Sequence, residues 1–346
     1  MKALVKTQKG KGFMEVRDVP EPTIRETEVL IEVKAVGVCG TDLHIYLDEF
    51  PYWPPVILGH EFSGVVAHIG REVTDWRVGD RVVGEPHTNA CGKCYLCRTG
   101  NPQICADKRS PGWGIDGACA RFMRWPEPHL LHRIPDGLGF EAASLVEPLA
   151  NVVTDVVLTQ SIMAGDVVIV SGPGPIGIMA ALVAKAAGAG TVSILGTNED
   201  EAMRLSLCRS LTAIDHVLNV QKDDVVRFVH DHTGGRGADV FIEASGAAPA
   251  MHLASEVIRK LGTVTAIGLT GKEKIDFPYD KFMMKSVKYL FNVSTKYESW
   301  ERSIALMASG IIPHERLVTH RAPIDQWQSV FDDLLARRGL KGLFIL

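Results

Sequence analysis

The sequence predicts an α/β protein that has a β-rich amino-terminal part and a second part built on a doubly wound parallel sheet. Short strand-like segments separated by glycines fill residues 1–150, and four cysteines cluster inside that region. After residue 150, strand-like runs alternate with helix-like runs, which is typical of βαβ units in a parallel sheet. The 346 residues are enough for about two domains.

The expected elements follow from hydrophobic patterns and turn residues. In the first part, we expect strands over 28–36, 63–69 and 80–83. In the second part, we expect strands over 166–171, 191–195, 240–243 and 263–267, with helices over 176–187 and 250–260. In the last part, we expect helices over 300–308 and 326–337 and a terminal strand over 343–346.

Composition excludes several classes of protein. Hydrophobic residues make up 46% and charged residues 23% of the chain, which argues against disorder, collagen and coiled coil. The formal net charge of −4 leaves no basic excess to neutralise a nucleic acid. The longest apolar runs, such as 179–187, are too short to span a bilayer, and the start lacks an apolar signal core. We therefore expect a cytoplasmic protein with no membrane or nucleic-acid partner.

Four of the seven cysteines have the spacing of a structural zinc site. Cys91, Cys94, Cys97 and Cys105 form a C-x2-C-x2-C-x7-C pattern, and four thiolates make a closed tetrahedral zinc site with no position for substrate. An iron–sulfur cluster is the alternative, but its bacterial run has three residues before a last cysteine that is followed by proline. Here the gap is seven and Ala106 follows, which favours zinc.

A dinucleotide-binding fingerprint follows the first expected strand of the second part. It consists of Gly172, Pro173, Gly174, Pro175, Ile176 and Gly177. Gly172 permits a tight turn, Gly174 lets the backbone approach a pyrophosphate, and Gly177 lets helix and strand pack closely. The pyrophosphate is expected at the positive end of the following helix.

The sequence leaves the choice between NAD and NADP open. An acidic residue about 20 positions on usually holds the ribose 2′-hydroxyl of NAD, but Gly196 and Thr197 stand at the end of the second strand. Loss of the acid would admit a 2′-phosphate. However, Arg204 is the nearest cation, and the acidic residues 199–201 would repel that phosphate.

A second group of residues suggests a catalytic metal. A catalytic zinc needs three protein ligands and an open position. Cys39, His60 and one carboxylate would supply the three ligands. Each residue alone is ambiguous, since free cysteines are often buried in the core. Their occurrence beside a four-cysteine cluster and a dinucleotide fingerprint favours a zinc-dependent oxidoreductase.

The chain resembles the zinc-dependent medium-chain alcohol dehydrogenases along nearly its whole length. The matching segments are 39–44 (Cys-Gly-Thr-Asp-Leu-His), 59–64 (Gly-His-Glu-Phe-Ser-Gly), 78–82, the cysteine cluster, 172–177 and 317–321 (Leu-Val-Thr-His-Arg). The resemblance implies a GroES-like catalytic domain over 1–152 that carries the zinc lobe at about 85–110. It also implies a Rossmann domain over 153–289, a segment over 290–346 that completes the catalytic domain, and a homo-oligomer, either dimer or tetramer.

The resemblance also implies the ligands of the catalytic zinc. The sorbitol (polyol) dehydrogenase branch has Glu-Pro-Leu where 147–149 stand here, whereas liver-type enzymes have a cysteine ligand there. We therefore expect Cys39, His60 and Glu61 as ligands. Glu147 is expected either as a fourth ligand or as the holder of a water beside the zinc, and its other reading is an acid at a helix amino terminus.

The implied reaction is hydride transfer between a secondary alcohol, such as a polyol, and NAD(P), which gives a ketone. Sorbitol dehydrogenases carry an Arg-Tyr pair for the polyol hydroxyls where Asn292 and Val293 stand here. L-Threonine 3-dehydrogenase and 2,3-butanediol dehydrogenase activity are therefore alternatives. Thr41 is expected to pass the alcohol proton onward and His44 to link the ribose hydroxyl to solvent, whereas Asp42 is expected to be structural.

Two other classes fit less well. Quinone or enone reductase relatives share the fold but lack the pair Cys39 and His60 and the four-cysteine cluster. A non-catalytic zinc-binding module that contacts nucleic acid is disfavoured by the net charge and by the few basic residues around the cluster.

Overall fold

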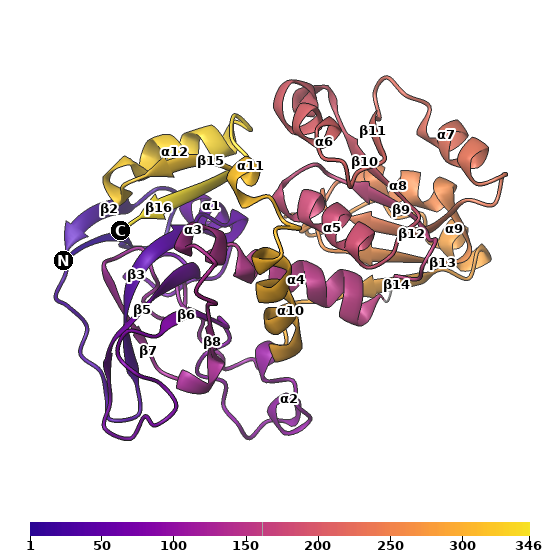
Figure 1. Cartoon of the computed structure of the whole chain (residues 1–346). Helices are drawn as coiled ribbons and strands as arrows, with labels where there is room; N and C mark the ends of the chain where they lie inside the picture. The colour runs from indigo at the N-terminus through magenta and orange to yellow at the C-terminus, as the bar shows by residue number, and fades with distance from the viewer. Residues whose placement is uncertain (161) are drawn as a thin grey trace. The chain divides into compact units, whose positions relative to one another are not determined.

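The computed structural model describes residues 1–160 and 162–346, which form two compact units. Unit 1 comprises Met1–Ala150 and Ser294–Leu346, and unit 2 comprises Asn151–Val293. The chain therefore leaves unit 1, forms unit 2 and returns to unit 1, as the colours of Figure 1 show. The predicted fold class, a β-rich domain together with a doubly wound parallel sheet, is confirmed.

Unit 1 contains a seven-stranded and a three-stranded sheet. The larger sheet has the order β15-β16-β3-β5-β6-β8, with β7 paired to β3, and the smaller has the order β2-β1-β4. The strands are β1 Lys2–Lys6, β2 Met14–Asp18, β3 Val29–Gly37, β4 Val56–Ile57, β5 Glu61–Ile69, β6 Arg81–Gly84, β7 Phe122–Trp125, β8 Leu131–Arg133, β15 Val318–Ala322 and β16 Lys341–Ile345.

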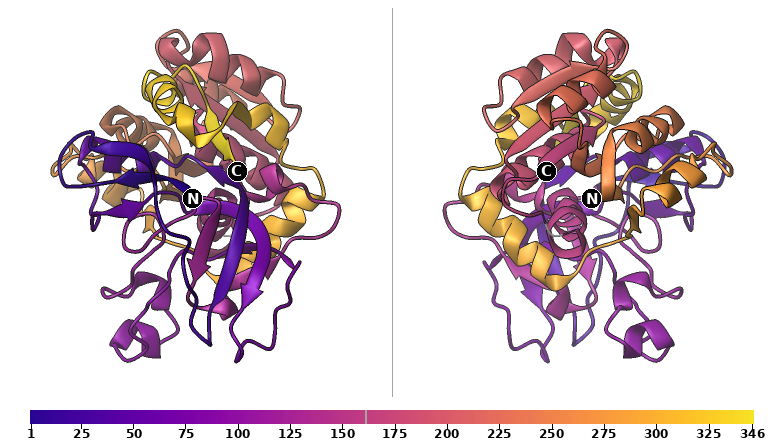
Figure 2. Two further views of the ribbon diagram at one scale, coloured as in Figure 1. Left: turned by 90° about the vertical axis from the view of Figure 1, so that its left-hand side faces the viewer. Right: turned by 90° about the vertical axis from the view of Figure 1, so that its right-hand side faces the viewer.

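The carboxyl-terminal segment is an integral part of the larger sheet. Strand β16 pairs antiparallel with β3, so that Leu343 lies opposite Gly37, and β15 runs parallel to β16. Both chain ends consequently lie on unit 1 (Figure 2), where Lys2 and Asp325 form an ion pair of 2.9 Å. Phe344 of β16 joins the same buried core as the strands that precede unit 2.

Unit 1 also contains short helices. They are α1 Gly40–Leu47, α2 Tyr95–Arg98, α3 Phe140–Ala143, α4 Val146–Val153 (whose last residues belong to unit 2), α10 Tyr297–Ala308, α11 His314–Leu317 and α12 Trp327–Leu335. Of these helices, α3, α11 and α12 contact strands of the larger sheet. Single 3-10 turns lie at Pro102–Ile104, Pro128–Leu130 and Ile324–Gln326.

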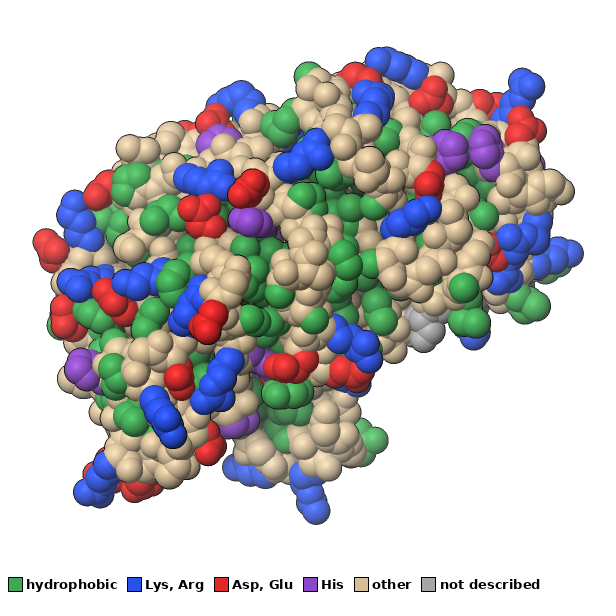
Figure 3. Space-filling model, in the orientation of Figure 1, with side chains coloured by type: hydrophobic (Ala, Val, Ile, Leu, Met, Phe, Trp, Pro, Cys, Tyr) green, Lys and Arg blue, Asp and Glu red, His purple; other side chains and the backbone are tan. Residues whose placement is uncertain are grey.

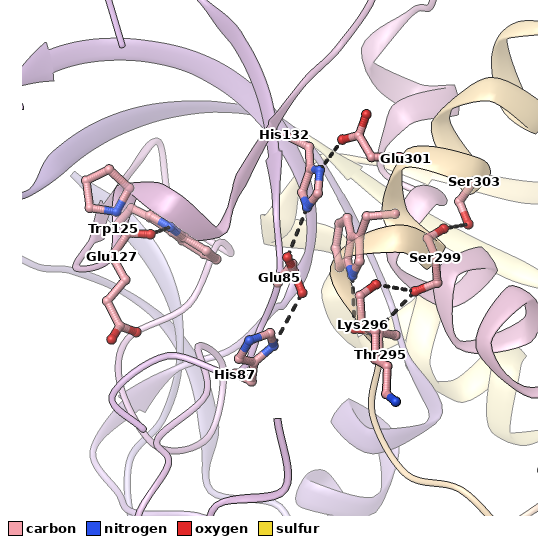
Figure 4. A network of polar contacts seen from close by, with 12 residues as sticks. Glu85, His87, Trp125, Glu127, His132, Thr295, Lys296, Ser299, Glu301 and Ser303 are labelled. Carbon is pink, nitrogen blue, oxygen red and sulfur yellow. Dashed lines mark hydrogen bonds and ion pairs between the residues drawn. The ribbon is translucent and has the colours of Figure 1, made fainter. Parts of the chain in front are cut away.

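A buried polar network fastens α10 to the sheet (Figure 4). The ring of His132 on β8 lies between two carboxylates, with Nε2 3.1 Å from Glu85 Oε1 and Nδ1 2.5 Å from Glu301 Oε1. The same ring stacks on Trp300 at a centroid distance of 5.4 Å. Contacts to ionised groups are stronger than neutral hydrogen bonds, so this network joins the segments that precede and follow unit 2.

Unit 2 contains a six-stranded sheet of order β11-β10-β9-β12-β13-β14, in which every neighbouring pair is parallel. The strands are β9 Val167–Ser171, β10 Thr191–Gly196, β11 His216–Asn219, β12 Ala238–Glu243, β13 Ile258–Ala266 and β14 Lys288–Phe291. The helices are α5 Pro175–Ala186, α6 Ser206–Arg209, α7 Val225–His232, α8 Ala248–Val257 and α9 Tyr279–Met284. A 3-10 turn at Asn198–Asp200 and π-helical turns at Thr154–Thr159 and Glu201–Leu205 complete it.

The expected helix over 250–260 is wrong at its end. Helix α8 ends at Val257, and residues 258–260 open strand β13. Ile258 pairs with Ala238 of β12, and the side chain of Arg259 binds Asp239. Pairing with a strand distant in sequence therefore overrides the helical composition of this stretch.

The helix from Phe140 to Thr159, formed by α3, α4 and the π-helical turn after them, passes a length-and-composition test for a membrane span. In the sequence, Glu141, Glu147 and Asp155 interrupt the apolar residues of this stretch. Within the fold, 78% of the tested window is buried. A core helix passes the same test, and we assign this helix to the core on the basis of that burial.

Candidate active site and metal centres

Cys39, His60 and Glu61 meet where β3 ends and β5 begins. The two strands are antiparallel neighbours, with Gly37 opposite Glu61. Cys39, which precedes α1, is thereby brought next to the start of β5. One sulfur, one ring nitrogen and one carboxylate oxygen of the three residues all lie within 4.8 Å of one another. The structure thus brings together the three ligands that were expected for a catalytic zinc.

The chemistry of this donor set fits zinc. Thiolate, imidazole and carboxylate are its usual protein ligands. Burial opposes a proton on His60, but the charges of Cys39 and Asp42 favour it and raise the pKa of His60 to about 10. Nδ1 of His60 is buried and has no hydrogen-bond partner in the part of the chain that the structure describes. A field that attracts a proton this strongly also favours a divalent cation.

Asp42, for which the sequence predicts a structural role, lies close to both Cys39 and His60. Its side chain is buried, its Oδ2 accepts a hydrogen bond of 2.8 Å from the Cys39 backbone, and its Oδ1 lies 4.0 Å from Nδ1 of His60. Carboxylates behind a metal-binding histidine commonly orient its ring. The signal in the sequence is its place three residues after Cys39, in the first turn of α1.

Lys341 is a member of the site that the sequence analysis missed. Its ammonium contacts Glu61 Oε2 and donates to the Val38 carbonyl at 2.9 Å, and the side chain is fully enclosed. Burial lowers its pKa, but the charges of Glu61 and Cys39 outweigh burial, so that the pKa lies above its ordinary value. Lys341 lies 280 residues after Glu61, and only the pairing of β16 with β3 brings it there.

Glu147 lies outside the three-residue group. It is in the first turn of α4 and is 8% exposed. Its charge acts on both His60 and Lys341, which places it in the same electrostatic environment.

Thr41 and His44 lie three residues apart on α1 and therefore share one face of that helix. Thr41 is half-buried beside Cys39, whereas His44 reaches solvent and its Nδ1 lies 2.9 Å from Glu49 Oε2. This arrangement places a hydroxyl and a partly exposed imidazole on one face of α1. Glu49 is the carboxylate partner that sequence spacing did not identify.

Aromatic rings border the His60 side of the site. The rings of Trp113 and His60 meet edge to face at a centroid distance of 4.9 Å, and Phe50 contacts Trp113 at 5.7 Å. Trp113 is half-buried. These rings hold the imidazole in place and give the neighbourhood of the metal ligands an apolar surface.

The four clustered cysteines form the second metal-ligand group. Their sulfurs lie within 4.8 Å of one another, and four of the distances are 3.5, 3.6, 3.8 and 4.0 Å. Tetrahedral zinc with bonds of about 2.3 Å requires sulfurs roughly 3.8 Å apart. The backbone N–H of Cys91 also stabilises the thiolate of Cys105 and lowers its pKa to about 6. The lobe has the geometry of a closed site.

The glycine-rich turn joins β9 to α5 in unit 2, as a dinucleotide fingerprint requires. Gly172 has a φ of +102°, a conformation that favours glycine. A side chain on Gly177 would clash with the carbonyl of Gly172, so its absence lets helix and strand approach. Gly174 is the N-cap of α5 and leaves its backbone open at the helix amino terminus.

Gly196 ends β10, and its surroundings explain the missing acid. A Cβ there would lie 2.8 Å from Leu205 and 2.9 Å from Pro173, so tight packing also favours glycine. Thr197 donates through its backbone N–H and its hydroxyl to Asp200, each at 3.0 Å. The carboxylate of Asp200 thus caps the turn that follows β10. The residue after Gly196 is Thr197, which carries no carboxylate.

Comparison with known proteins agrees with these features. The model "Alcohol dehydrogenase GroES-like domain" matches residues 25–136, and "Zinc-binding dehydrogenase" matches residues 175–309. Sorbitol dehydrogenase of Halalkalibacterium halodurans is 38% identical over 99% of this chain and 98% of its own length. L-Threonine 3-dehydrogenase of Rhizobium etli is 35% identical over 100% and 98%. A putative zinc-binding dehydrogenase from Sinorhizobium meliloti, solved with NADP, is 30% identical with a TM-score of 0.91 over 100% and 99% of the two chains.

The fold, the two ligand clusters and the glycine turn define a nicotinamide- and zinc-dependent oxidoreductase. The chain belongs to the zinc-dependent medium-chain alcohol dehydrogenase family, in which the resemblance noted in the sequence placed it.

Proposed function

We propose that this protein oxidises a secondary alcohol of the polyol type to a ketone with NAD or NADP, and catalyses the reverse reaction. The cluster of Cys39, His60 and Glu61 carries the proposal, because it supplies a buried, negatively charged site for a catalytic cation. The 38% identity with a sorbitol dehydrogenase over nearly the whole chain supports the substrate class.

In this proposal each residue has a defined role. When bound, zinc supplies a Lewis acid that makes the alcohol acidic, and the nicotinamide supplies the hydride acceptor. Cys39, His60 and Glu61 hold the zinc, and Glu147 is a fourth ligand or binds a water. Thr41 would accept the alcohol proton while its own hydroxyl proton moves to the ribose hydroxyl of the coenzyme, and His44, whose Nδ1 lies 2.9 Å from Glu49 Oε2, would link that ribose hydroxyl to solvent. The glycine turn at 172–177 and the strand end at Gly196 and Thr197 bind the coenzyme.

We also assign the remaining parts of the chain. Cys91, Cys94, Cys97 and Cys105 bind a structural zinc, which gives two zinc ions per chain. We assign the GroES-like domain to 1–152, the Rossmann domain to 153–289 and the segment that completes the catalytic domain to 290–346, boundaries that lie within a few residues of those of units 1 and 2. A cytoplasmic location is supported by seven cysteines, none of which forms a disulfide.

Replacement of the cation's ligands tests the proposal. We expect Cys39→Ala and His60→Ala to reduce turnover at least ~1000-fold, since loss of the cation removes several kcal/mol of transition-state stabilisation. NADH binding, measured by fluorescence titration, should remain, because the glycine turn is unchanged. The exposed Val78→Ala serves as the control. Turnover comparable to wild type in either ligand variant would refute the catalytic role of this cluster.

The substrate needs a separate experiment. Asn292 and Val293 in place of an Arg-Tyr pair favour an alternative to sorbitol itself, and the 35% identical threonine dehydrogenase supplies one. Polyols, 2,3-butanediol and L-threonine should be compared by absorbance at 340 nm with each coenzyme. A kcat/KM highest for L-threonine would replace the polyol assignment but keep the secondary alcohol.

We further propose a homo-oligomer formed through unit 2. Strand β14 is at the edge of its sheet, and an open edge can pair with another chain. Exposed apolar side chains occur on this strand and in the segments that precede and follow it in the chain, namely Leu269, Tyr279, Met283, Met284, Phe291 and Val293. A second copy of the chain would cover both the edge and these side chains.

A further inference from the structure

Unit 2 has a hollow at the amino-terminal ends of its parallel strands, whereas the glycine turn lies at their carboxyl-terminal ends. Its lining comes from α7 and the turn after it, the end of α8, the start of β13 and the residue after α9. The glycine turn follows the carboxyl end of β9, whereas these segments surround the amino-terminal ends of β12 and β13, which run parallel to β9. The volume of about 680 Å³ is in the range of small-molecule sites.

Positive charge dominates this hollow. Its charged and titratable lining residues are His230, Arg236, Glu256, Arg259, Lys260 and Lys285. Glu256 is already paired with Lys281 of α9. The whole chain has a net charge of −4, so this excess of cations does not follow from composition. On the face in Figure 3, Lys and Arg side chains gather at the right-hand margin, where Figure 1 has α7 and α9.

One buried carboxylate orients both arginines. Asp239, 6% exposed, accepts hydrogen bonds from Nη1 and Nη2 of Arg236 at 2.5 and 2.9 Å and from Nε of Arg259 at 2.6 Å. A single acid cannot neutralise two guanidinium groups. Nη2 of Arg259 has no partner within residues 1–160 and 162–346, and guanidinium groups held in this way fit the oxygens of phosphate.

The two lysines complete the lining in different ways. Nζ of Lys285 donates to the carbonyls of Glu256 and Ile258, at 2.9 and 2.7 Å, and these bonds fix its position. Lys260 is exposed and has no ion pair or hydrogen bond from its ammonium in the described ranges. The hollow therefore combines cations of fixed position with one that can move onto a ligand.

We propose that this hollow binds a small polyanion that carries two or more phosphate groups, at a site separate from the coenzyme site. The fixed cations Arg236, Arg259 and Lys285 would each face at least one phosphate oxygen. Lys260 would close over the ligand. Such a ligand neutralises the excess of positive charge that the protein itself leaves.

Inorganic pyrophosphate is the probe, titrated into zinc-loaded protein by calorimetry. A saturating concentration of the reduced coenzyme keeps pyrophosphate out of the glycine turn. We expect one pyrophosphate per chain, with an affinity that falls as salt is raised. Lys260→Glu should weaken binding about tenfold or more. Lys274→Glu makes the same charge change at an exposed position of unit 2 outside the hollow and should leave binding unchanged.

A third variant tests the guanidinium geometry. Arg259→Lys keeps the charge but removes the planar group, and it should weaken pyrophosphate binding while circular dichroism shows an intact fold. The proposal is overturned if wild-type protein shows no saturable binding. It is also overturned if Lys260→Glu and Lys274→Glu change the affinity equally, because binding would then follow the general field of the protein.

Discussion

At the residue scale, the buried charge of Glu61 has a partner that lies far away in sequence. The residue types of Cys39 and His60 indicate a possible metal site in the sequence. Nothing in the sequence indicates that Lys341 forms an ion pair with Glu61. Asp42 lies between these two cases. Its spacing from Cys39 is visible in the sequence, but its position near His60 is visible only in the fold. Residue type therefore predicted the candidate ligands, whereas the residues that lie against them became visible only in the fold.

Asp155 provides a prediction at this scale. Burial raises its pKa to about 7, although a hydrogen bond with Asn292 opposes the shift, and Oδ1 has no partner in the described residues. A carboxyl whose pKa is higher in the folded state stabilises the protein at low pH, and that contribution is lost as pH rises toward 7. Relative to Asp155→Asn, the unfolding free energy of wild type should fall by about 2–3 kcal/mol between pH 5 and pH 8.

Urea denaturation of both proteins across this pH range measures the effect. Asp325→Asn is the control, because Asp325 is about half exposed in an ion pair and should give the same pH profile as wild type. Parallel curves for wild type and Asp155→Asn would show that Asp155 is ionised in the folded protein.

At the element scale, tertiary contacts decide where elements end and how they are attached. Residues 258–260 look helical in isolation but join β13, because β12 offers a pairing partner. The sequence predicts a helix over 300–308, within α10, yet its attachment depends on His132 of β8 and on Glu85, which follows β6, and both precede unit 2 in the sequence. Local patterns thus indicate the type of element better than its limits.

The attachment of α10 leads to the second prediction. His132→Leu leaves the buried carboxylate of Glu85 without its main partner, so we expect a loss of about 3–5 kcal/mol in unfolding free energy. Glu301→Gln should cost about 1 kcal/mol, because Glu301 is half exposed and glutamine still offers an oxygen. Thermal and urea unfolding compare the two variants, and equal losses would contradict a buried charge network centred on His132.

At the scale of the whole molecule, one chain builds a catalytic unit from two separated segments, with the coenzyme unit inserted between them. The β16–β3 pairing closes the sheet of unit 1, and it also delivers Lys341 to the metal site. On the face shown in Figure 3, acidic and basic side chains are largely interspersed away from the right-hand margin, in keeping with an enzyme of small molecules.

The third prediction concerns assembly. Phe291→Asp places a charge on the exposed edge strand β14, and we expect it to shift the protein from oligomer to monomer in light scattering coupled to size exclusion. Val78→Asp, an equally drastic change at an exposed position of unit 1, should leave the mass unchanged. An unchanged mass for Phe291→Asp would place the interface elsewhere.

The sequence by itself determined the fold class, the family and the candidate ligands of the two clusters that could hold a metal ion. These features depend on short-range spacing, such as the four cysteines within fifteen residues and the glycine turn between a strand and a helix. Only the tertiary structure decided which residues neutralise and orient those ligands, where β13 begins, and that cations gather in a hollow away from the coenzyme. Such features depend on contacts between residues far apart in the chain, which local pattern does not encode.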